Sequence, residues 1–223
     1  MGRFRFLDLS ISLHELYPTI LSRLTTSSPP PKFLDFGCCF GQDIRKLITD
    51  GVSGENLYGA DLRSEFIELG YELFRDKDKL KARFVQGDVL AEGGAAAEAL
   101  LELDGKRDVI YAASFFHLFS WTDQVRVAIR MARFFNQQTH DAVIFGRQVG
   151  STVASEYSER GASKDNSRYV HNEESFQQLW DEVGEKTETK WKVKVKLVEV
   201  EDWLRTTETR ATDRMMWFEV HRL

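Results

Sequence analysis

The feature that most constrains the fold is a repeated alternation of short apolar segments with helical segments between residues 32 and 145. Strands that alternate with helices of roughly 10–15 residues predict right-handed crossovers and a parallel sheet with helices on both faces. The expected strands are Lys32–Phe36, Asn56–Ala60, Ala82–Val85, Asp108–Ala113 and Ala142–Phe145. The helices expected between them are Asp43–Thr49, Ser64–Phe74, Ala95–Leu103 and Thr122–Asn136, with Ser64 in a capping box.

The amino-terminal part of the chain lies outside this alternation. Apolar residues recur at three- and four-residue spacing over Ser12–Leu24, which predicts a helix that Pro18 kinks or breaks into two pieces. The stretch TTSSPPP at Thr25–Pro31 predicts a surface linker. We therefore expect an N-terminal helical segment and linker at 1–31 and a single globular domain at 32–223.

The carboxyl-terminal part departs from the alternation in another way. After a helix near Glu173–Val183, strand patterns at Lys190–Val200 and Met215–His221 follow with no room for a crossover helix. The simplest closure is an antiparallel pair at the edge of the sheet. The predicted fold class is α/β, with a Rossmann-like, mostly parallel seven-stranded sheet and a C-terminal antiparallel hairpin.

Charge and hydropathy exclude several classes of partner. The chain has 30 Lys and Arg against 35 Asp and Glu, a net charge of −5, and the two signs are interspersed. Nucleic-acid binding usually needs a basic stripe, and the lysines that alternate with apolar residues over Lys190–Leu197 indicate one solvated face of a strand. No apolar run reaches the ~18 residues of a membrane helix. We expect a soluble, cytoplasmic protein without a nucleic-acid or membrane partner, and the oligomeric state stays open, a homodimer included.

The two cysteines, Cys38 and Cys39, are adjacent. Adjacent cysteines close only a strained ring, so an ordinary structural disulfide is excluded. Two ligands are also too few for a zinc site, and no metal is expected. Free thiols fit a reducing compartment.

Three turns at the expected carboxyl edge of the sheet carry candidate ligand-binding residues, because open α/β sheets bind ligands there. Asp35–Gly41 (DFGCCFG) offers glycines and a helix amino terminus for close approach of a ligand. Asp61 ends the second strand at the sequence distance typical of a ribose-binding acid, and Asp88 follows the third strand. Each has a plainer alternative: tight packing for the glycines and helix N-caps for Asp61 and Asp88.

The pattern Asp35-x-Gly37-x-Cys39-x-Gly41 resembles motif I of class I S-adenosylmethionine-dependent methyltransferases, normally D/E-x-G-x-G-x-G. The acidic end of the second strand, the GDV turn and the terminal hairpin resemble the same superfamily. More narrowly, FLDFGCCFGQDIRKL, DGVSGENLYGADL, FIELGYELFRD and YVHNEESFQQLW resemble fungal methyltransferases of meroterpenoid and related secondary-metabolite pathways. The resemblance covers most of residues 4–223, and GCC-x-GQD-x-RKL is a fairly specific signature.

Two departures from these families bear on function. Cys39 stands where the general motif has a glycine, although Cys-Cys resembles the narrower family. The relatives carry an additional helical stretch ahead of the RFLDL segment, near which this sequence starts, and such helices usually roof the substrate. Either this is a short form with a more open pocket, or residues are missing.

The resemblance implies S-adenosyl-L-methionine as cofactor and assigns roles residue by residue. Asp35 would orient the loop and the methionine amine, Asp61 would accept the ribose hydroxyls, and Asp88 would hold the adenine amino group. The remaining cofactor-binding residues implied are Gly37, Cys38, Cys39, Gly41, Leu62, Val89 and Ser114.

The acceptor determines what further chemistry is needed. A carboxylate is already ionised at neutral pH, whereas a phenol with a pKa near ~10 needs a base. His117 is the candidate base or substrate-positioning residue, and the alternative is a histidine packed among phenylalanines. Arg147 and Arg168 could clamp an acid, with a surface position as the alternative for each. Tyr169 and His171 precede a helix that could act as a lid, or they serve as N-capping loop residues.

Three functions remain compatible with these residues. The first is an O-methyltransferase of a small-molecule secondary metabolite that methyl-esterifies a carboxyl group of a polyketide–terpenoid acid. The second is a methyltransferase with a phenol or nitrogen acceptor. The third is a cofactor-binding regulatory or interaction module that kept the fold without catalysis.

Overall fold

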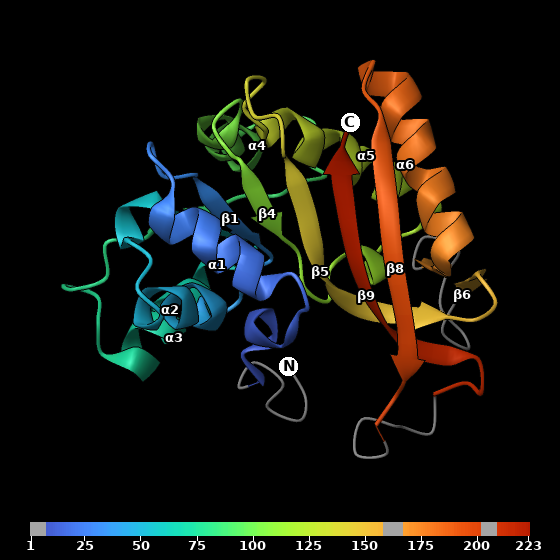
Figure 1. Cartoon of the computed structure of the whole chain (residues 1–223), viewed down its shortest axis with the longest axis horizontal. Coiled ribbons are helices and arrows are strands. Elements are labelled where there is room, and N and C mark those ends of the chain that lie inside the picture. Colours follow the sequence, from blue (N-terminus) through green and yellow to red (C-terminus); the bar gives the residue numbers. More distant parts are fainter. Residues whose placement is uncertain (1–7, 158–166, 202–208) are drawn as a thin grey trace. The chain divides into compact units, whose positions relative to one another are not determined.

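The computed structural model describes residues 8–157, 167–201 and 209–223 (Figure 1). The chain forms two compact units, Met1–Ala113 with Arg133–Thr139 and Ser114–Ala132 with His140–Leu223. The strand order of the main sheet is β3-β2-β1-β4-β5-β9-β8, which confirms the predicted fold class. The predicted boundary at residue 31 stays a prediction. In the described part of the chain, no helix combines the length and apolar character needed to cross a membrane.

The strands of the first unit are short and buried. Strand β1 pairs in parallel with β2 and β4, and β2 pairs in parallel with β3. All four residues of β1 are buried, as expected for a parallel strand covered on both faces. The strands are β1 (Phe33–Phe36), β2 (Leu57–Asp61), β3 (Arg83–Gln86) and β4 (Val109–Tyr111).

The helices of the first unit follow the predicted order with local differences. Helix α3 has the predicted bounds, but its N-cap is Arg63 and no side-chain cap bond is described, so the capping box at Ser64 was wrong. The segment expected as one helix at Ala95–Leu103 is half α-helix and half 3₁₀-helix. The helical elements are η2 (Ser10–Leu13), α1 (Tyr17–Thr26), α2 (Gln42–Thr49), η3 (Gly54–Asn56), α3 (Ser64–Phe74), α4 (Ala95–Ala99) and η4 (Leu100–Leu103).

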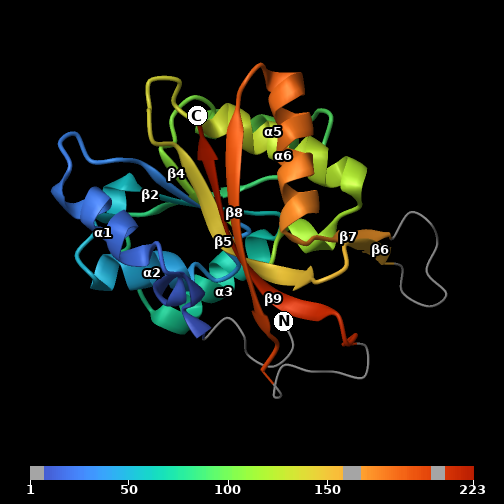
Figure 2. The same ribbon diagram turned by 45° about the vertical axis from the view of Figure 1, so that its right-hand side comes forward.

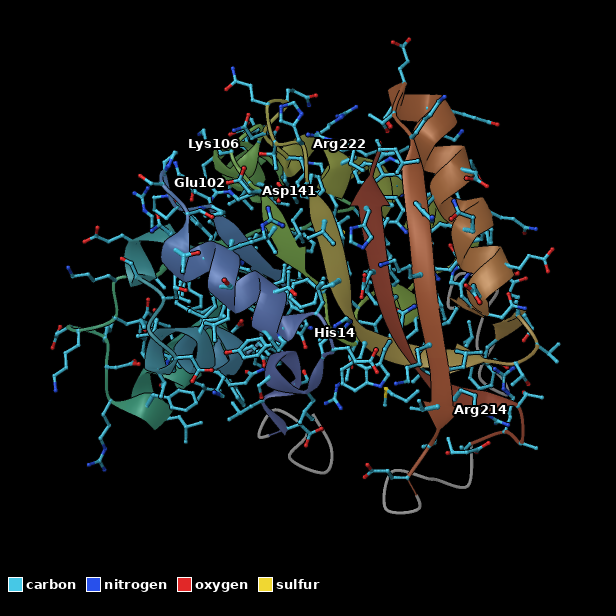
Figure 3. All side chains as sticks on the ribbon, viewed as in Figure 1. His14, Glu102, Lys106, Asp141, Arg214 and Arg222 are labelled. Carbon is cyan, nitrogen blue, oxygen red and sulfur yellow. The ribbon has the colours of Figure 1, made fainter. Side chains whose placement is uncertain are left out.

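The amino-terminal segment is broken ahead of Pro18, one of the two predicted outcomes. Pro18 lies in the first turn of α1, where its missing N–H is not needed. His14, labelled in Figure 3, lies between η2 and α1, and its Nδ1 accepts a 3.0 Å bond from the backbone N–H of Leu16. Ile11 is fully buried, so this segment contributes to the core of the first unit.

The second unit is built on three antiparallel strands. Strand β9 lies between β5 and β8 and pairs antiparallel with both (Figures 1 and 2), which confirms the predicted antiparallel pair at the edge. Helix α6 lies along β8 (Figure 1). The elements are η5 (Phe116–Leu118), α5 (Trp121–Phe134), β5 (Val143–Ser151), β6 (Ser155–Tyr157), β7 (Arg168–Val170), α6 (Glu173–Thr187), β8 (Trp191–Glu199) and β9 (Asp213–Arg222).

An aromatic cluster forms the core of the second unit. The ring of Phe116 lies 5.7 Å from Phe176, 6.2 Å from Trp180 and 6.0 Å from Phe218, each in an edge-to-face arrangement. Such pairs add to the stabilisation from apolar burial. Because Phe116 begins η5, this packing fixes the segment that carries His117.

Candidate functional site

The turn after β1 is shaped by residues in the left-handed region of backbone space. Gly37 and Gly41 have φ of 80° and 67°, and Cys39 has φ of 52°. The N–H groups of Gly37 and Cys38 both donate to the carbonyl of Ala60 in β2, at 2.8 and 3.1 Å. The turn is therefore tied to the neighbouring strand, and its glycines permit a shape that other residues adopt only with strain.

Asp61 is held by two backbone donors at the end of β2. Its Oδ2 accepts a 2.8 Å bond from Cys39 N–H, and its Oδ1 accepts a 2.9 Å bond from Arg63 N–H. Each carboxylate oxygen has further lone pairs that can accept from a ligand. The carboxylate predicted to bind ribose is thus already oriented, because its oxygens accept bonds from Cys39 of the turn after β1 and from Arg63, two residues further along the chain.

Asp35 is a buried acid at the base of the same turn. It is 2% exposed, and its Oδ2 has no hydrogen-bond partner among the described residues. Burial, and after it the negative charges of Asp43 and Asp61, hold the pKa of Asp35 well above its usual range. A buried acceptor without a donor is unstable on its own and suits a ligand that brings an N–H or an ammonium group.

Asp43 follows the same loop, in the first turn of helix α2, and is also buried. Its Oδ1 accepts a 3.0 Å bond from the backbone N–H of Ile11 in the amino-terminal segment. Sequence reasoning treated Asp43 only as a helix start, although an acid in the first turn of a helix is a signal for such an anchoring role.

The third turn, after β3, carries Asp88 and Val89, both half-buried. Asp88 Oδ1 accepts a 2.9 Å bond from Leu90 N–H, so the side chain is turned back on its own loop. Leu62 is 53% exposed, which leaves it free surface for a flat apolar ligand. The first unit thus places the predicted residues of all three turns at the carboxyl ends of three neighbouring parallel strands.

The cysteines of the turn are free thiols, as expected. Burial raises the pKa of the Cys38 thiol well above its usual range and raises that of Cys39 to about 11. Both thiols are therefore protonated at neutral pH, which makes them poor nucleophiles.

The residues predicted to act on the acceptor lie in the second unit, and so does Ser114, which was predicted to bind the cofactor. Ser114 has φ of 52°, and its N–H donates a 2.6 Å bond to the carbonyl of Arg147. His117 is half-buried, and its backbone N–H donates to Gln148 Oε1 at 3.3 Å. Strand β5 therefore holds the segment that carries both candidates.

The two arginine candidates differ in their surroundings. Arg147 is buried in β5, and its guanidinium lies 5.7 Å from the centre of the Trp217 ring. Arg168 is half-buried in β7, whose pairing with β6 was not predicted. The roles proposed for Arg147 and Arg168 toward an acidic substrate stay predictions.

His171 is fully buried and has two side-chain partners. Its Nδ1 lies 3.0 Å from Ser175 Oγ, and its Nε2 lies 3.0 Å from Gln124 Oε1. Burial lowers the pKa of His171 to about 3, so the ring is neutral. This arrangement favours the alternative in which His171 supports the start of α6. Tyr169 is half-buried, and its ring lies 4.9 Å from that of Trp121.

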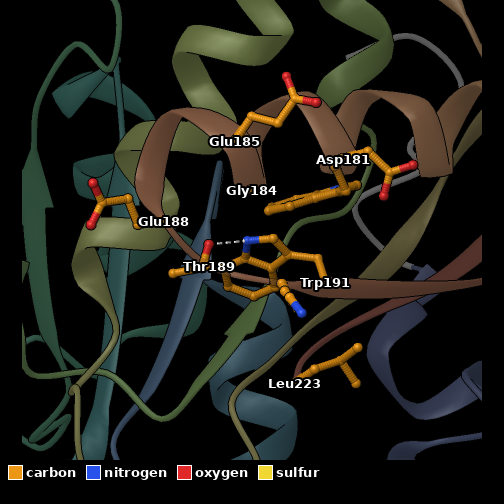
Figure 4. Close-up of a pocket in the computed structure, with 9 residues that line it drawn as sticks. Asp181, Gly184, Glu185, Glu188, Thr189, Trp191 and Leu223 are labelled. Atoms are coloured by element: carbon orange, nitrogen blue, oxygen red, sulfur yellow. Dashed lines mark hydrogen bonds between the residues drawn. The ribbon is translucent and has the colours of Figure 1, made fainter.

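A pocket of about 600 Å³ lies between the end of α6 and the start of β8 (Figure 4). Trp180 and Trp191 line it, and Trp191 Nε1 donates a 2.7 Å bond to Thr189 Oγ1. Asp181, Glu185 and Glu188 also line it. None of the predicted site residues lines this pocket, so it belongs to neither the predicted cofactor site nor the predicted acceptor site.

Comparisons with known proteins agree with this geometry. The family described as "Methyltransferase domain" matches residues 33–138. The O-methyltransferase phiE of a fungal species is 43% identical over 92% of this chain and 66% of its own length. The Asnovolin E/Chermesin D methyltransferase nvfJ of Aspergillus novofumigatus is 40% identical over 85% of this chain and 65% of its own length. The methyltransferase ausD of Aspergillus calidoustus is 32% identical over 87% of this chain and 67% of its own length.

Solved structures show the same fold. The 1,6-didemethyltoxoflavin-N1-methyltransferase of Burkholderia thailandensis, solved with 1,6-didemethyltoxoflavin and S-adenosylhomocysteine, superposes with a TM-score of 0.60 at 12% identity, covering 99% of this chain and 82% of that one. The chain spans slightly less than two thirds of the length of the first relatives that it matches. Because the methyltransferase ausD is 32% identical and this chain covers two thirds of it, the chain belongs to the methyltransferase family.

Proposed function

We propose that the chain is an O-methyltransferase that binds S-adenosylmethionine in its first unit and methylates a small-molecule fungal secondary metabolite. The observation that carries this proposal is the buried Asp35 carboxylate, whose Oδ2 lacks a donor among the described residues, beside a turn that bonds to Asp61. The fungal relatives named as methyltransferases support the reaction class.

The residues of the first unit fit such a cofactor. Asp35 offers a buried acceptor to the ammonium group of the methionine part, and Asp61 offers an oriented carboxylate to a ribose diol. Leu62 offers an exposed apolar side chain to the adenine, and Asp88 lies on the next turn to accept from its amino group. When bound, the cofactor supplies a methyl group on a positively charged sulfur.

The chain's own contribution is alignment and the exclusion of water. Asp35 would fix the methionine end of the ligand, Asp61 its central ribose, and Asp88 its adenine end. We propose a carboxylate acceptor, because an ionised carboxylate needs no general base and His117 is left to orient it. Arg147 and Arg168 would pair with acidic groups of the substrate.

Transfer of a radioactive methyl group tests this function directly. Purified protein is incubated with tritiated S-adenosylmethionine and an acidic organic extract of a fungal culture. The expected result is label in the organic phase that mild base releases as methanol, the signature of a methyl ester. Stable label that resists base would replace the ester with an ether or N-methyl product. No label, with no binding of S-adenosylhomocysteine, would remove the enzymatic function.

A cytoplasmic location completes the proposal, whereas the choice between a monomer and a homodimer stays open. Free thiols at Cys38 and Cys39 are compatible with a reducing compartment. Light scattering on the purified protein distinguishes a monomer from a dimer.

A further inference from the structure

Arg45 in α2 is a shielded cation with partners on two sides. Its Nε donates to Asp76 Oδ2 at 2.7 Å, and its Nη2 donates to Asp76 Oδ1 at 2.8 Å. The two side chains are 11% and 20% exposed. A bidentate pair of this kind is directional, so Asp76 fixes the plane and the rotation of the guanidinium group.

The remaining guanidinium nitrogen points at the turn after β1. Nη1 of Arg45 donates a 2.6 Å bond to the carbonyl of Phe40 and a 3.2 Å bond to the carbonyl of Gly41. These carbonyls close the motif I turn at the point where α2 begins. Arg45 therefore connects the backbone of the turn with the segment that follows α3.

Helix α3 supports this connection from the other side. The Arg45 guanidinium lies 4.4 Å from the centre of the Phe74 ring and 5.6 Å from that of Tyr71. A Cβ atom on Gly70 would lie 2.3 Å from the Phe40 carbonyl oxygen, so only glycine lets the helix approach the turn this closely. Arg45 and α3 thus hold the Phe40 peptide from two directions.

The turn has a specific need for such support. Cys39 stands at the central position of the motif with φ of 52°, a conformation that a residue with a Cβ adopts with strain. Strained residues persist only where the surrounding structure over-determines them. The bonds of Arg45 to Phe40 and Gly41, one and two residues further on, restrict the conformations into which Cys39 could relax.

We propose that Arg45 is a positioning residue for the cofactor, which acts through the carbonyls of Phe40 and Gly41 and is itself held by Asp76. The inference rests on the proposed cofactor binding by the first unit. It adds an arginine that does not touch the ligand, and it makes the segment after α3 part of the cofactor-binding apparatus.

Three variants test the proposal. Arg45→Met removes the clamp, and Asp76→Asn removes the charge that orients it. Lys46→Met is the matched control, because Lys46 is the neighbouring residue of the same helix and its amine pairs instead with Asp50, 2.6 Å away. For each protein, calorimetry gives the Kd of S-adenosylhomocysteine, and hydrogen exchange gives the protection of the amides of residues 39–42 without ligand.

We expect Arg45→Met to raise the Kd by about tenfold to a hundredfold, Asp76→Asn to raise it less, and Lys46→Met to leave it within about twofold. Amide exchange at residues 39–42 should be faster in Arg45→Met and Asp76→Asn but not in Lys46→Met. In turnover, these two variants should raise the KM of the cofactor and leave that of the acceptor constant.

If Arg45→Met has the same Kd and the same exchange rates as Lys46→Met, the inference is overturned. If the unaltered protein does not bind S-adenosylhomocysteine, the proposed function fails, and the exchange comparison still decides whether Arg45 holds the turn. If Arg45→Met does not fold, Asp76→Asn decides by the same two measurements.

Discussion

The backbone N–H of Cys39 donates a 2.8 Å hydrogen bond to Oδ2 of Asp61, although the two residues belong to different strand–helix turns. The bond joins the turn after β1 to the end of β2, and it exists without any ligand. Asp61 is therefore oriented before a ligand arrives, so little side-chain entropy remains to be lost on binding.

Replacement of Asp61 by alanine is expected to weaken cofactor binding. The change removes charge-assisted hydrogen bonds to the ribose, a loss of about 1.5–3 kcal/mol in binding free energy. Calorimetric titration with S-adenosylhomocysteine measures it. Asp61→Asn is the control for the bond to Cys39: the amide oxygen of asparagine can still accept from the Cys39 N–H, whereas the negative charge is lost. Unchanged affinity in Asp61→Ala would remove this residue from the site.

Replacement of Asp35 by asparagine is expected to stabilise the ligand-free protein at pH 7 and to weaken cofactor binding. The folded state raises the pKa of Asp35, mainly by burial, so the ionised form destabilises the fold. This destabilisation begins above the unfolded pKa near ~4 and grows until the pH passes the folded pKa.

Thermal unfolding of Asp35→Asn and of the unaltered protein at pH 4 and pH 7 measures the effect. The difference in melting temperature should be larger at pH 7 than at pH 4, with a weaker affinity for S-adenosylhomocysteine. A variant with a lower melting temperature and full affinity would contradict both parts.

The cysteines are expected to be dispensable for chemistry. Their raised pKa values keep both thiols protonated at neutral pH, and a protonated thiol is a poor nucleophile. The double variant Cys38→Ser, Cys39→Ser should keep kcat within about tenfold, equivalent to about 1.4 kcal/mol. Loss of all turnover while S-adenosylhomocysteine still binds would assign a chemical role to this pair.

The second unit is expected to lose stability in acid because of His171. Its pKa is lowered to about 3 in the folded state by burial, whereas the unfolded chain protonates near ~6.5. As the pH falls below ~6.5, the unfolded state binds the extra proton, and the free energy of unfolding drops by up to about 1.4 kcal/mol per pH unit.

Urea denaturation between pH 7 and pH 4.5 checks this dependence. His171→Gln should show a flatter pH dependence, with a lower stability at pH 7 from the lost contacts. His140→Gln, at an exposed histidine, is the matched control and should follow the unaltered protein. Equal slopes in all three proteins would exclude His171 as the acid-sensitive group.

The pH dependence of turnover is expected to reveal the acceptor. With a carboxylate acceptor the rate should be flat from about pH 6 to 8, and His117→Gln should retain measurable activity, since the nucleophile is already charged. With a phenol acceptor the rate would instead rise through a pKa near ~6.5, and the variant would lose roughly 10²–10⁴-fold. The second result would overturn the ester and leave the cofactor assignment intact.

Most of the fold could be predicted because its elements are marked by apolar periodicity. Helix α3 begins and ends where the sequence predicts. Strand β5 was predicted too short, because it continues past Phe145 with the polar residues Arg147, Gln148 and Ser151, all of which are buried. Strands β6 and β7 were missed, since they are only three residues long and lack the apolar run that marks the equally short β4.

Some residues of the candidate site could also be predicted from the sequence, and others could not. The acids of the three turns could be predicted, because each lies at or just past the carboxyl end of a strand. The role of Arg45 could not, because its carboxylate partner Asp76 is remote in sequence and the pairing depends on how α3 packs. The buried state of His171 was equally hidden, since it depends on Gln124 in a distant helix.

Strand β9 comes later in the chain than both of its neighbours, although it lies between them. During synthesis on a ribosome, β5 and β8 therefore emerge before the strand that joins them, and the backbone groups that later pair with β9 bond to water until then. Non-local pairing of this kind forms slowly and leaves strand edges open to other chains meanwhile. The synthesis of Asp213–Arg222 thus sets the moment at which the nascent second unit can escape aggregation.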